Sequence, residues 1–309
     1  MTASRGTLAS GDAMKPRPTR TSFPSAFPYR WWFMVFQTFL CMMLTASALA
    51  QQSPKAPAGG SMQVGHSPST PAIPAADQLI FDDEFDGSQL DLAKWYRCFN
   101  WCDENVGYSY GPPYDLEWYW KHNVSVTGGM LHLTARKQHE HGYDYTSGVI
   151  TTGGSQTEPP SFTFLYGYME LSAKFPAGKG MWPAFWLLPA DGSWPPEIDA
   201  MEWQGGTPTI DYATIHWGVQ HNGHHPSSGT SFETGIDLST GFHTYGLNWQ
   251  ADSVTWYFDG KVVKKFTRVN DIPHKPMYIL VDLAVGGWIS FPDSSTHFPA
   301  TMLVDYVRV

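Results

Sequence analysis

Apolar and polar residues alternate along most of the chain after residue 77, as they do in β-strands, whose successive side chains point to opposite faces of a sheet. Gly128-Gly129 and Asp259-Gly260-Lys261 fit the tight turns of two hairpins, and helical periodicity is almost absent. The pattern therefore predicts an all-β protein, an antiparallel β-sandwich. Strands are predicted at 79–81, 124–126, 130–135, 167–175, 181–189, 213–218, 242–249, 254–263, 277–285 and 303–309.

The first 77 residues lack this alternation. Residues 1–30 are polar and basic, and residues 31–50 are apolar and end in Ala48-Leu49-Ala50. This predicts a cleaved signal peptide over residues 1–50, with Met14 as an alternative start of translation. An uncleaved membrane anchor is the other interpretation, because about 20 apolar residues can span a bilayer.

Residues 51–77 are rich in Pro, Ser and Gly, which predicts a disordered linker, so the folded domain is expected at residues 78–309. After cleavage we expect a secreted protein, extracellular or periplasmic, that does not contact the membrane.

The composition agrees with many short strands and turns. The chain has 29 Gly, 24 Pro and 15% aromatic residues among 309 residues. Its formal net charge is −9 although residues 1–50 are basic, so the folded part is acidic. Nucleic acid binding needs clustered Lys and Arg. The acidic charge of the folded part therefore argues against nucleic acid as a partner.

The segment from Trp194 to Trp203 contains three carboxyls and two indoles. In a regular strand Glu197 and Asp199 share one face, and Glu202 falls on the other. A β-bulge near Ala200-Met201 would return Glu202 to the face of the other two acids. An exposed acidic strand and a calcium-binding loop are the simpler alternatives.

With such a bulge, the Cα atoms of the two glutamates lie roughly 13 Å apart, and side chains that lean together narrow the gap between carboxyls. The separation then approaches the ~5–5.5 Å typical of retaining glycosidases rather than the ~6.5–9.5 Å of inverting ones.

Glu-Ile-Asp-Ala-Met-Glu resembles the bulged E-x-D-x-x-E signature of glycoside hydrolase family 16, similar to bacterial laminarinases. The resemblance covers about residues 78–309 and implies a jelly roll with a concave substrate cleft. It implies Glu197 as nucleophile, Asp199 as its helper and Glu202 as general acid/base. Three adjacent carboxyls do not all ionise freely, so at least one should keep a proton near neutral pH.

The resemblance also implies substrate-binding residues. Trp182 and Trp186 lie at even spacing and are expected on the floor of the cleft. The aromatic stretch 95–122 is expected to form outer sugar subsites, because indole and phenol rings stack on pyranose faces. For any single ring, packing in the core is the alternative. The remaining candidates are Trp203, His216, Glu117, Asn123 and Trp288, and the histidines of 221–225 are expected to be incidental surface residues.

The sequence also predicts a metal site and a cysteine pair, which do not take part in the catalytic step. Related enzymes imply a structural calcium held by Glu84, the carbonyl of Gly129 and Asp305. No cofactor is required for the reaction itself. Cys98 and Cys102 either close a small disulfide loop or remain free thiols.

These features predict a monomeric, endo-acting, retaining β-glucan hydrolase that cleaves β-1,3- or β-1,3-1,4-glucan, with a polysaccharide as its partner. A galactan hydrolase of the agarase or carrageenase kind and a transglycosylase are alternatives within the same scaffold. A non-catalytic sugar-binding sandwich is the alternative from another class.

Overall fold

The computed structural model of the protein describes residues 78–221 and 224–309. The predicted signal peptide and linker lie in residues 1–77, outside the described residues. Within the described part of the chain, no helix is long and apolar enough to cross a membrane.

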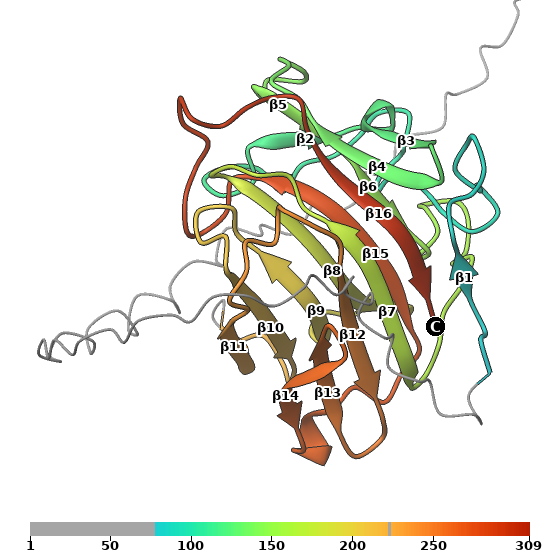
Figure 1. Ribbon diagram of the computed structural model, residues 1–309. Coiled ribbons are helices and arrows are strands. Elements are labelled where there is room, and N and C mark those ends of the chain that lie inside the picture. Colours follow the sequence, from blue (N-terminus) through green and yellow to red (C-terminus); the bar gives the residue numbers. More distant parts are fainter. Residues whose placement is uncertain (1–77, 222–223) are drawn as a thin grey trace, which may run out of the picture.

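Two antiparallel sheets stack face to face, which confirms the predicted sandwich (Figure 1). The larger sheet has eight strands and the smaller has six. In spatial order the larger contains β14 (Lys261–Phe266), β13 (Val254–Phe258), β12 (His243–Trp249), β7 (Gly167–Lys174), β16 (Ala300–Arg308), β4 (Met130–Ala135) and β3 (Val124–Thr127), with β1 (Asp82–Asp83) beside β16.

The six-stranded sheet carries the acidic segment. Its spatial order is β11 (Ser227–Glu233), β10 (Ile210–His216), β9 (Glu197–Trp203), β8 (Met181–Pro189), β15 (Met277–Val285) and β6 (Val149–Thr151). A separate parallel pair joins β2 (Glu117–Tyr119) to β5 (Tyr145–Ser147). Helical structure among the described residues is limited to two 3-10 turns, η2 (Lys121–Asn123) and η3 (Val269–Asp271).

Most predicted strands are present, and the differences are local. The first strand pairs at Asp82–Asp83 rather than at 79–81. β11 was not predicted, because its sequence Ser-Ser-Gly-Thr-Ser-Phe-Glu is almost wholly polar. It is an edge strand that pairs only with β10, so its side chains do not need an apolar face.

The main core lies between the two sheets. Trp203, Trp249, Trp256 and Phe185 are fully buried there. β15 is buried at every position, because one of its faces joins this core while Tyr278, Leu280 and Ala284 join a second cluster on the other side. The outer face of the six-stranded sheet is therefore itself covered in part by side chains.

The second cluster is aromatic and includes a disulfide. Cys98 and Cys102 are bonded, which decides between the two alternatives for this pair. Phe99, between them, stacks on Trp101 with ring centroids 5.0 Å apart and packs edge-on to Tyr119 at 5.1 Å. The disulfide thus closes the loop that covers this end of the outer face.

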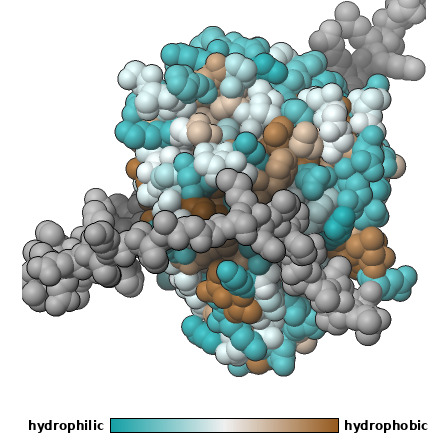
Figure 2. All heavy atoms as spheres, viewed as in Figure 1, coloured by the Kyte–Doolittle hydropathy of each residue, from teal (hydrophilic) through white to brown (hydrophobic). Residues whose placement is uncertain are grey.

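Apolar residues form small patches among hydrophilic ones on the face that Figure 2 shows. Large apolar side chains that are exposed, such as Leu92, Val219 and Val262, belong to separate loops and strands. Apolar residues scattered in this way are usual on protein surfaces and do not by themselves indicate a docking face.

Candidate active site

Strand β9 contains the predicted bulge. Asp199 pairs with Trp186 of β8 and Met201 pairs with Phe185, so Ala200 has no partner on that strand. The register with β10 shifts at the same point, where Thr214 faces Asp199 and Tyr212 faces Glu202. One extra residue therefore restores Glu202 to the outer face, beside Glu197 and Asp199. These three residues are called the acid triad.

A tryptophan of the opposite sheet binds the bulge from beneath. The indole Nε1–H of Trp256 on β13 donates a 2.8 Å hydrogen bond to the backbone carbonyl of Asp199. The ammonium of Lys264 lies 4.5 Å from the centroid of the Trp256 ring and donates to the carbonyls of Ala213 and Ser228. The carbonyl at the bulge thus keeps a partner although the regular ladder is interrupted.

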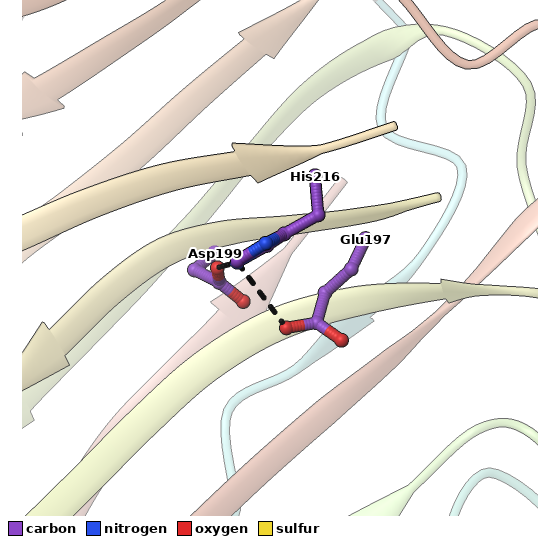
Figure 3. A group of neighbouring side chains, drawn as sticks. All are labelled: Glu197, Asp199 and His216. Carbon is purple, nitrogen blue, oxygen red and sulfur yellow. Dashed lines mark ion pairs between the residues drawn. The ribbon is translucent and has the colours of Figure 1, made fainter. Parts of the chain in front are cut away.

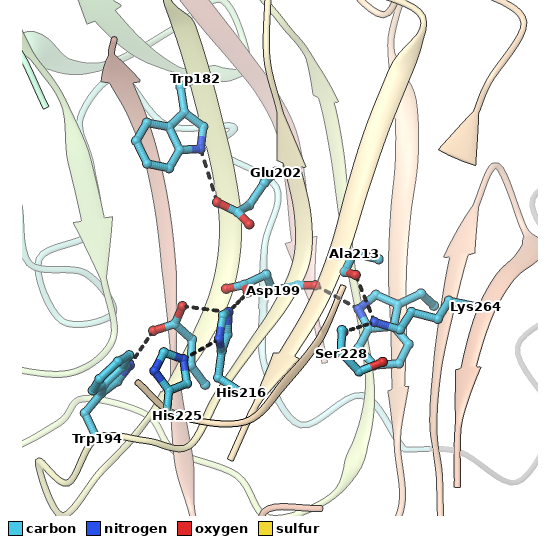
Figure 4. A network of polar contacts seen from close by, with 11 residues as sticks. Trp182, Trp194, Asp199, Glu202, Ala213, His216, His225, Ser228 and Lys264 are labelled. Atoms are coloured by element: carbon cyan, nitrogen blue, oxygen red, sulfur yellow. Dashed lines mark hydrogen bonds and ion pairs between the residues drawn. The ribbon is translucent and has the colours of Figure 1, made fainter. Parts of the chain in front are cut away.

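Each glutamate of the triad accepts a hydrogen bond from an indole. Trp194 Nε1–H donates to Glu197 Oε2 at 2.7 Å, and Trp182 Nε1–H donates to Glu202 Oε1 at 3.2 Å (Figure 4). Both indoles are partly exposed. They therefore fix the carboxyls while forming part of the surface around them.

His216 completes the cluster from β10. Its Nε2 lies 3.2 Å from Asp199 Oδ2 and 3.7 Å from Glu197 Oε1 (Figure 3). Within the described residues, Glu197, Asp199 and His216 are also the one group of acidic, His or Cys side chains whose ligand atoms, all within 4.8 Å of one another, could hold a metal ion. The same residues form the acid centre, so this grouping needs no metal to explain it.

The triad shares its negative charge. Burial, followed by the charge of Asp199, raises the pKa of Glu197 to about 8. Burial raises the pKa of Asp199 to about 7. Burial and the charges of Asp199 and Glu197 raise the pKa of Glu202 well above its usual range. The triad therefore does not carry three negative charges at neutral pH, as like charges in a buried site predict.

Asp282 on β15 is a carboxyl that the sequence analysis did not single out. It is 4% exposed and accepts hydrogen bonds from Trp186 Nε1–H at 2.7 Å and from the hydroxyl of Tyr119 at 2.8 Å. Burial raises its pKa to about 7. A lone acid in the apolar run of 277–285 was the available signal, because a buried acid needs partners.

A comparison with known proteins identifies the family. The model of the glycosyl hydrolases family 16 matches residues 113–308. The chain belongs to this family. It is 37% identical over 248 residues to the endo-1,3-1,4-beta-glycanase ExsH of Rhizobium meliloti, a match that covers 74% of this chain and 50% of that protein.

Other family 16 members are similar over a comparable part of the chain. The glucan endo-1,3-beta-glucosidase A1 of Niallia circulans is 35% identical over 272 residues, which cover 78% of this chain and 39% of that protein. The chain therefore spans half or less of the length of these two curated relatives. The laminarinase catalytic domain of Thermotoga maritima has a TM-score of 0.63 and 33% identity, covering 75% of this chain and 97% of that one. The sandwich is thus the jelly roll of family 16.

Four of the predicted substrate-binding residues lie together on the outer face of the six-stranded sheet. Trp182, Trp186, His216 and Trp288 are partly exposed. Trp288 packs edge-on to Trp182 with ring centroids 4.9 Å apart. Trp182 and His216 contact the acid triad directly, where a family 16 enzyme would need surfaces for sugar rings.

The structure corrects the prediction for three other residues. Trp203 is fully buried, packs against Phe175 and donates to the carbonyl of Pro208. It follows Glu202 directly, so strand alternation turns it into the core once Glu202 faces outward. This orientation was predictable from the bulge.

Glu117 and Asn123 are also inside the protein. Glu117 is fully buried and accepts a hydrogen bond from the backbone N–H of Val285. The Asn123 amide is 3% exposed and donates to the Thr134 carbonyl and the Thr146 hydroxyl. Both side chains bind the protein's own segments together rather than facing a ligand.

Two of the three residues predicted to hold calcium have partners within the protein. Both carboxylate oxygens of Glu84 accept hydrogen bonds from Arg308 at 2.7 Å, and Asp305 is exposed and accepts a 3.4 Å hydrogen bond from Ser172. Both carboxylate oxygens of Glu84 are thus paired with the Arg308 guanidinium. Calcium binding by Glu84, Gly129 and Asp305 stays a prediction.

Proposed function

We propose that this protein is an endo-acting β-glucan hydrolase that works by double displacement with retention of anomeric configuration. The bulge at Ala200 carries the proposal, because it brings Glu202 to the outer face beside Glu197. Retaining glycosidases use two neighbouring carboxyls, and here two carboxyls lie on one face of the sheet, each with its own hydrogen-bond donor.

The surroundings of the two glutamates support different roles. Glu197 accepts a 2.7 Å hydrogen bond from Trp194 and has His216 nearby, and both favour its ionised form. Glu202 accepts a longer hydrogen bond from Trp182, and burial together with its two acidic neighbours raises its pKa well above the usual range, which favours the protonated form. Glu197 is therefore the proposed nucleophile and Glu202 the proposed general acid.

In the proposed first step Glu202 gives its proton to the glycosidic oxygen while a Glu197 oxygen attacks the anomeric carbon. The bond to the leaving sugar breaks, and a glycosyl-enzyme forms. The Glu202 carboxylate then takes a proton from water, whose oxygen attacks the same carbon and releases Glu197. Asp199, next to His216, keeps negative charge close to Glu197 and so favours return of the proton to Glu202.

A neutral β-glucan is the proposed substrate class. The site combines partly exposed indoles with several carboxyls, and the ammonium of Lys264 donates to backbone carbonyls. Sulfated or carboxylated chains would meet like charge there. The names of the relatives, an endo-1,3-1,4-beta-glycanase and a glucan endo-1,3-beta-glucosidase, agree with this choice.

The test is release of reducing sugar from laminarin, lichenan, agarose and carrageenan. Activity on laminarin or lichenan supports the proposal, and activity confined to agarose or carrageenan replaces it with the galactan alternative. Binding of glucan without any turnover would indicate a sugar-binding protein. NMR of the first product anomer tests retention, and Glu197→Gln and Glu202→Gln should each fold and lose hydrolysis by at least about 1,000-fold.

We also propose export of the protein. The apolar run that ends in Ala48-Leu49-Ala50 and the Cys98–Cys102 disulfide support it, since disulfides persist in oxidising compartments. N-terminal sequencing of the protein from culture medium or periplasm should find Gln51 as the first residue. An intact leader in a membrane fraction would support the anchor instead.

A further inference from the structure

His225 lies beside His216 and Trp194, although its sequence neighbourhood predicted an incidental surface residue. It is partly buried in the connection between β10 and β11. Its Nε2 lies 2.8 Å from Nδ1 of His216, and its ring packs edge-on to Trp194 with centroids 4.5 Å apart (Figure 4). His225 therefore contacts both side chains that support Glu197.

A single proton lies between the two imidazole nitrogens that form this contact. Burial, followed by the neighbouring His216 and His224, lowers the pKa of His225 to about 4, and burial also lowers the pKa of His216. Both rings are thus neutral at pH 7. In a hydrogen bond between two neutral imidazoles one nitrogen donates and the other accepts.

The two possible directions of this hydrogen bond have different consequences for the acids. If His216 Nδ1–H donates, the lone pair of its Nε2 faces the oxygens of Asp199 and Glu197, 3.2 and 3.7 Å away. That arrangement opposes ionisation of either carboxyl. If His225 Nε2–H donates instead, His216 carries its proton on Nε2 and offers a donor to them.

We propose that His225 is a positioning residue for the nucleophile: its Nε2–H donates to His216 Nδ1 and holds His216 in the tautomer whose Nε2–H faces Asp199 and Glu197. The role rests on the proposed function, in which Glu197 attacks as a carboxylate. A second-neighbour group that fixes the tautomer of an active-site histidine is a recurrent device in enzymes.

Other titratable groups also influence the pKa values of the acid triad and the two histidines, and so contribute to the pH dependence of the site. They lie on β9, β14, β15, the loop before β11 and the aromatic stretch 95–122, and they are Asp199, Glu202, Lys264, Asp282, His224 and Tyr110. Substitution of His225 leaves all of them in place.

The kinetic test compares His225→Leu, His225→Gln and the control His221→Leu, which changes an exposed histidine of the same connection. In His225→Leu the acidic limb of the kcat/KM profile on laminarin should move up by about one pH unit, because the carboxylate of Glu197 loses support. KM should change little. His225→Gln should restore the limb, since its amide N–H can donate to His216.

The proposal is overturned if the acidic limb of His225→Leu does not move. It is also overturned if the limb of His225→Gln moves as far as that of His225→Leu. The control should match the unsubstituted protein.

A readout that needs no activity separates this proposal from the proposed function. Two-bond ¹H–¹⁵N spectra of the full chain near pH 7, assigned with His216→Gln, should report the Nε2–H tautomer for His216. The Nδ1–H tautomer overturns the role of His225 even if the enzyme hydrolyses glucan or if His225→Leu does not fold. Lack of hydrolysis on every glucan, with the Nε2–H tautomer present, overturns the proposed function alone.

Discussion

At the scale of single residues, indoles are the main partners of the buried carboxyls. Trp194 donates to Glu197, Trp182 to Glu202 and Trp186 to Asp282. An indole has a donor but no acceptor, so it stabilises a carboxylate without exchanging a proton with it. Its large ring also excludes water, which favours the protonated acid. The two effects oppose each other, and burial is the stronger for Glu197.

Trp194→Phe separates these two effects, because it removes the donor and keeps most of the ring. The Glu197 carboxylate then loses a hydrogen bond to a charged group, which is typically worth about 1.5–3 kcal/mol. We expect kcat/KM on laminarin to fall roughly 10- to 100-fold near neutral pH, with the acidic limb moved upward. An unchanged pH profile would show that the indole only fills space.

The raised pKa of Glu197 also makes the stability of the fold depend on pH. An exposed glutamate titrates near 4.5 and Glu197 near 8, so between these values the folded state binds more protons than the unfolded state. Stability then decreases as pH rises through this window, by up to about 1.4 kcal/mol per pH unit from this group.

Glu197→Gln removes that titration. The variant should therefore be more stable than the unsubstituted protein, with a difference in Tm that grows from pH 5 to pH 8. Thermal unfolding followed by circular dichroism at both pH values measures it. A difference that is constant or shrinks toward pH 8 contradicts the prediction.

At the scale of the element, β9 places its acids correctly only because of one extra residue. The bulge interrupts the ladder, and Trp256 of the opposite sheet supplies a donor to the Asp199 carbonyl there. The position and stability of the bulge therefore depend on a side chain of the core. Through this contact, packing between the two sheets helps to orient the acids on the outer face.

Trp256→Phe should leave the Asp199 carbonyl without this donor and lower the free energy of unfolding by about 1–3 kcal/mol. It should also lower kcat, because the bulge that orients Glu202 is less well held. Trp249→Phe is the matched control, since Trp249 is equally buried and donates to Pro273. Urea unfolding and kcat on laminarin are measured for both. Equal kcat values for the two variants would refute a special role for Trp256.

At the scale of the whole molecule, the loop closed by the Cys98–Cys102 disulfide covers one end of the outer face. Phe99 lies between the two cysteines and its ring centroid is 6.3 Å from that of Trp186. The loop thus connects the disulfide to the side chains near the acid triad. We expect the fixed conformation of this loop to matter more for the binding of long substrates than for the bond-breaking step.

The double variant Cys98→Ser, Cys102→Ser tests whether the disulfide loop contributes to substrate binding. A disulfide that closes so short a loop contributes roughly 2 kcal/mol, so Tm should fall. KM for laminarin should rise several-fold, while kcat stays within about twofold because the acids are held by β9 and β10. A large loss of kcat with unchanged KM would place the loop in the chemistry instead.

Much of this arrangement was predictable because it depends on neighbours in the sequence. Alternation of apolar residues predicted the strands, and the odd spacing of Glu202 required the bulge at Ala200. The same rule would have directed Trp203 inward had it been applied one residue further. Local spacing determines side-chain direction within a strand, since successive residues point to opposite faces.

The sequence by itself determined the antiparallel sandwich, the acid triad and its bulge. Only the tertiary structure decided that Glu117 and Asn123 are buried, that Asp282 binds Trp186, and that His225 reaches His216. Those contacts join segments from different strands and loops. They depend on which strands become neighbours and which loops cover them, and no periodicity within one segment contains that information.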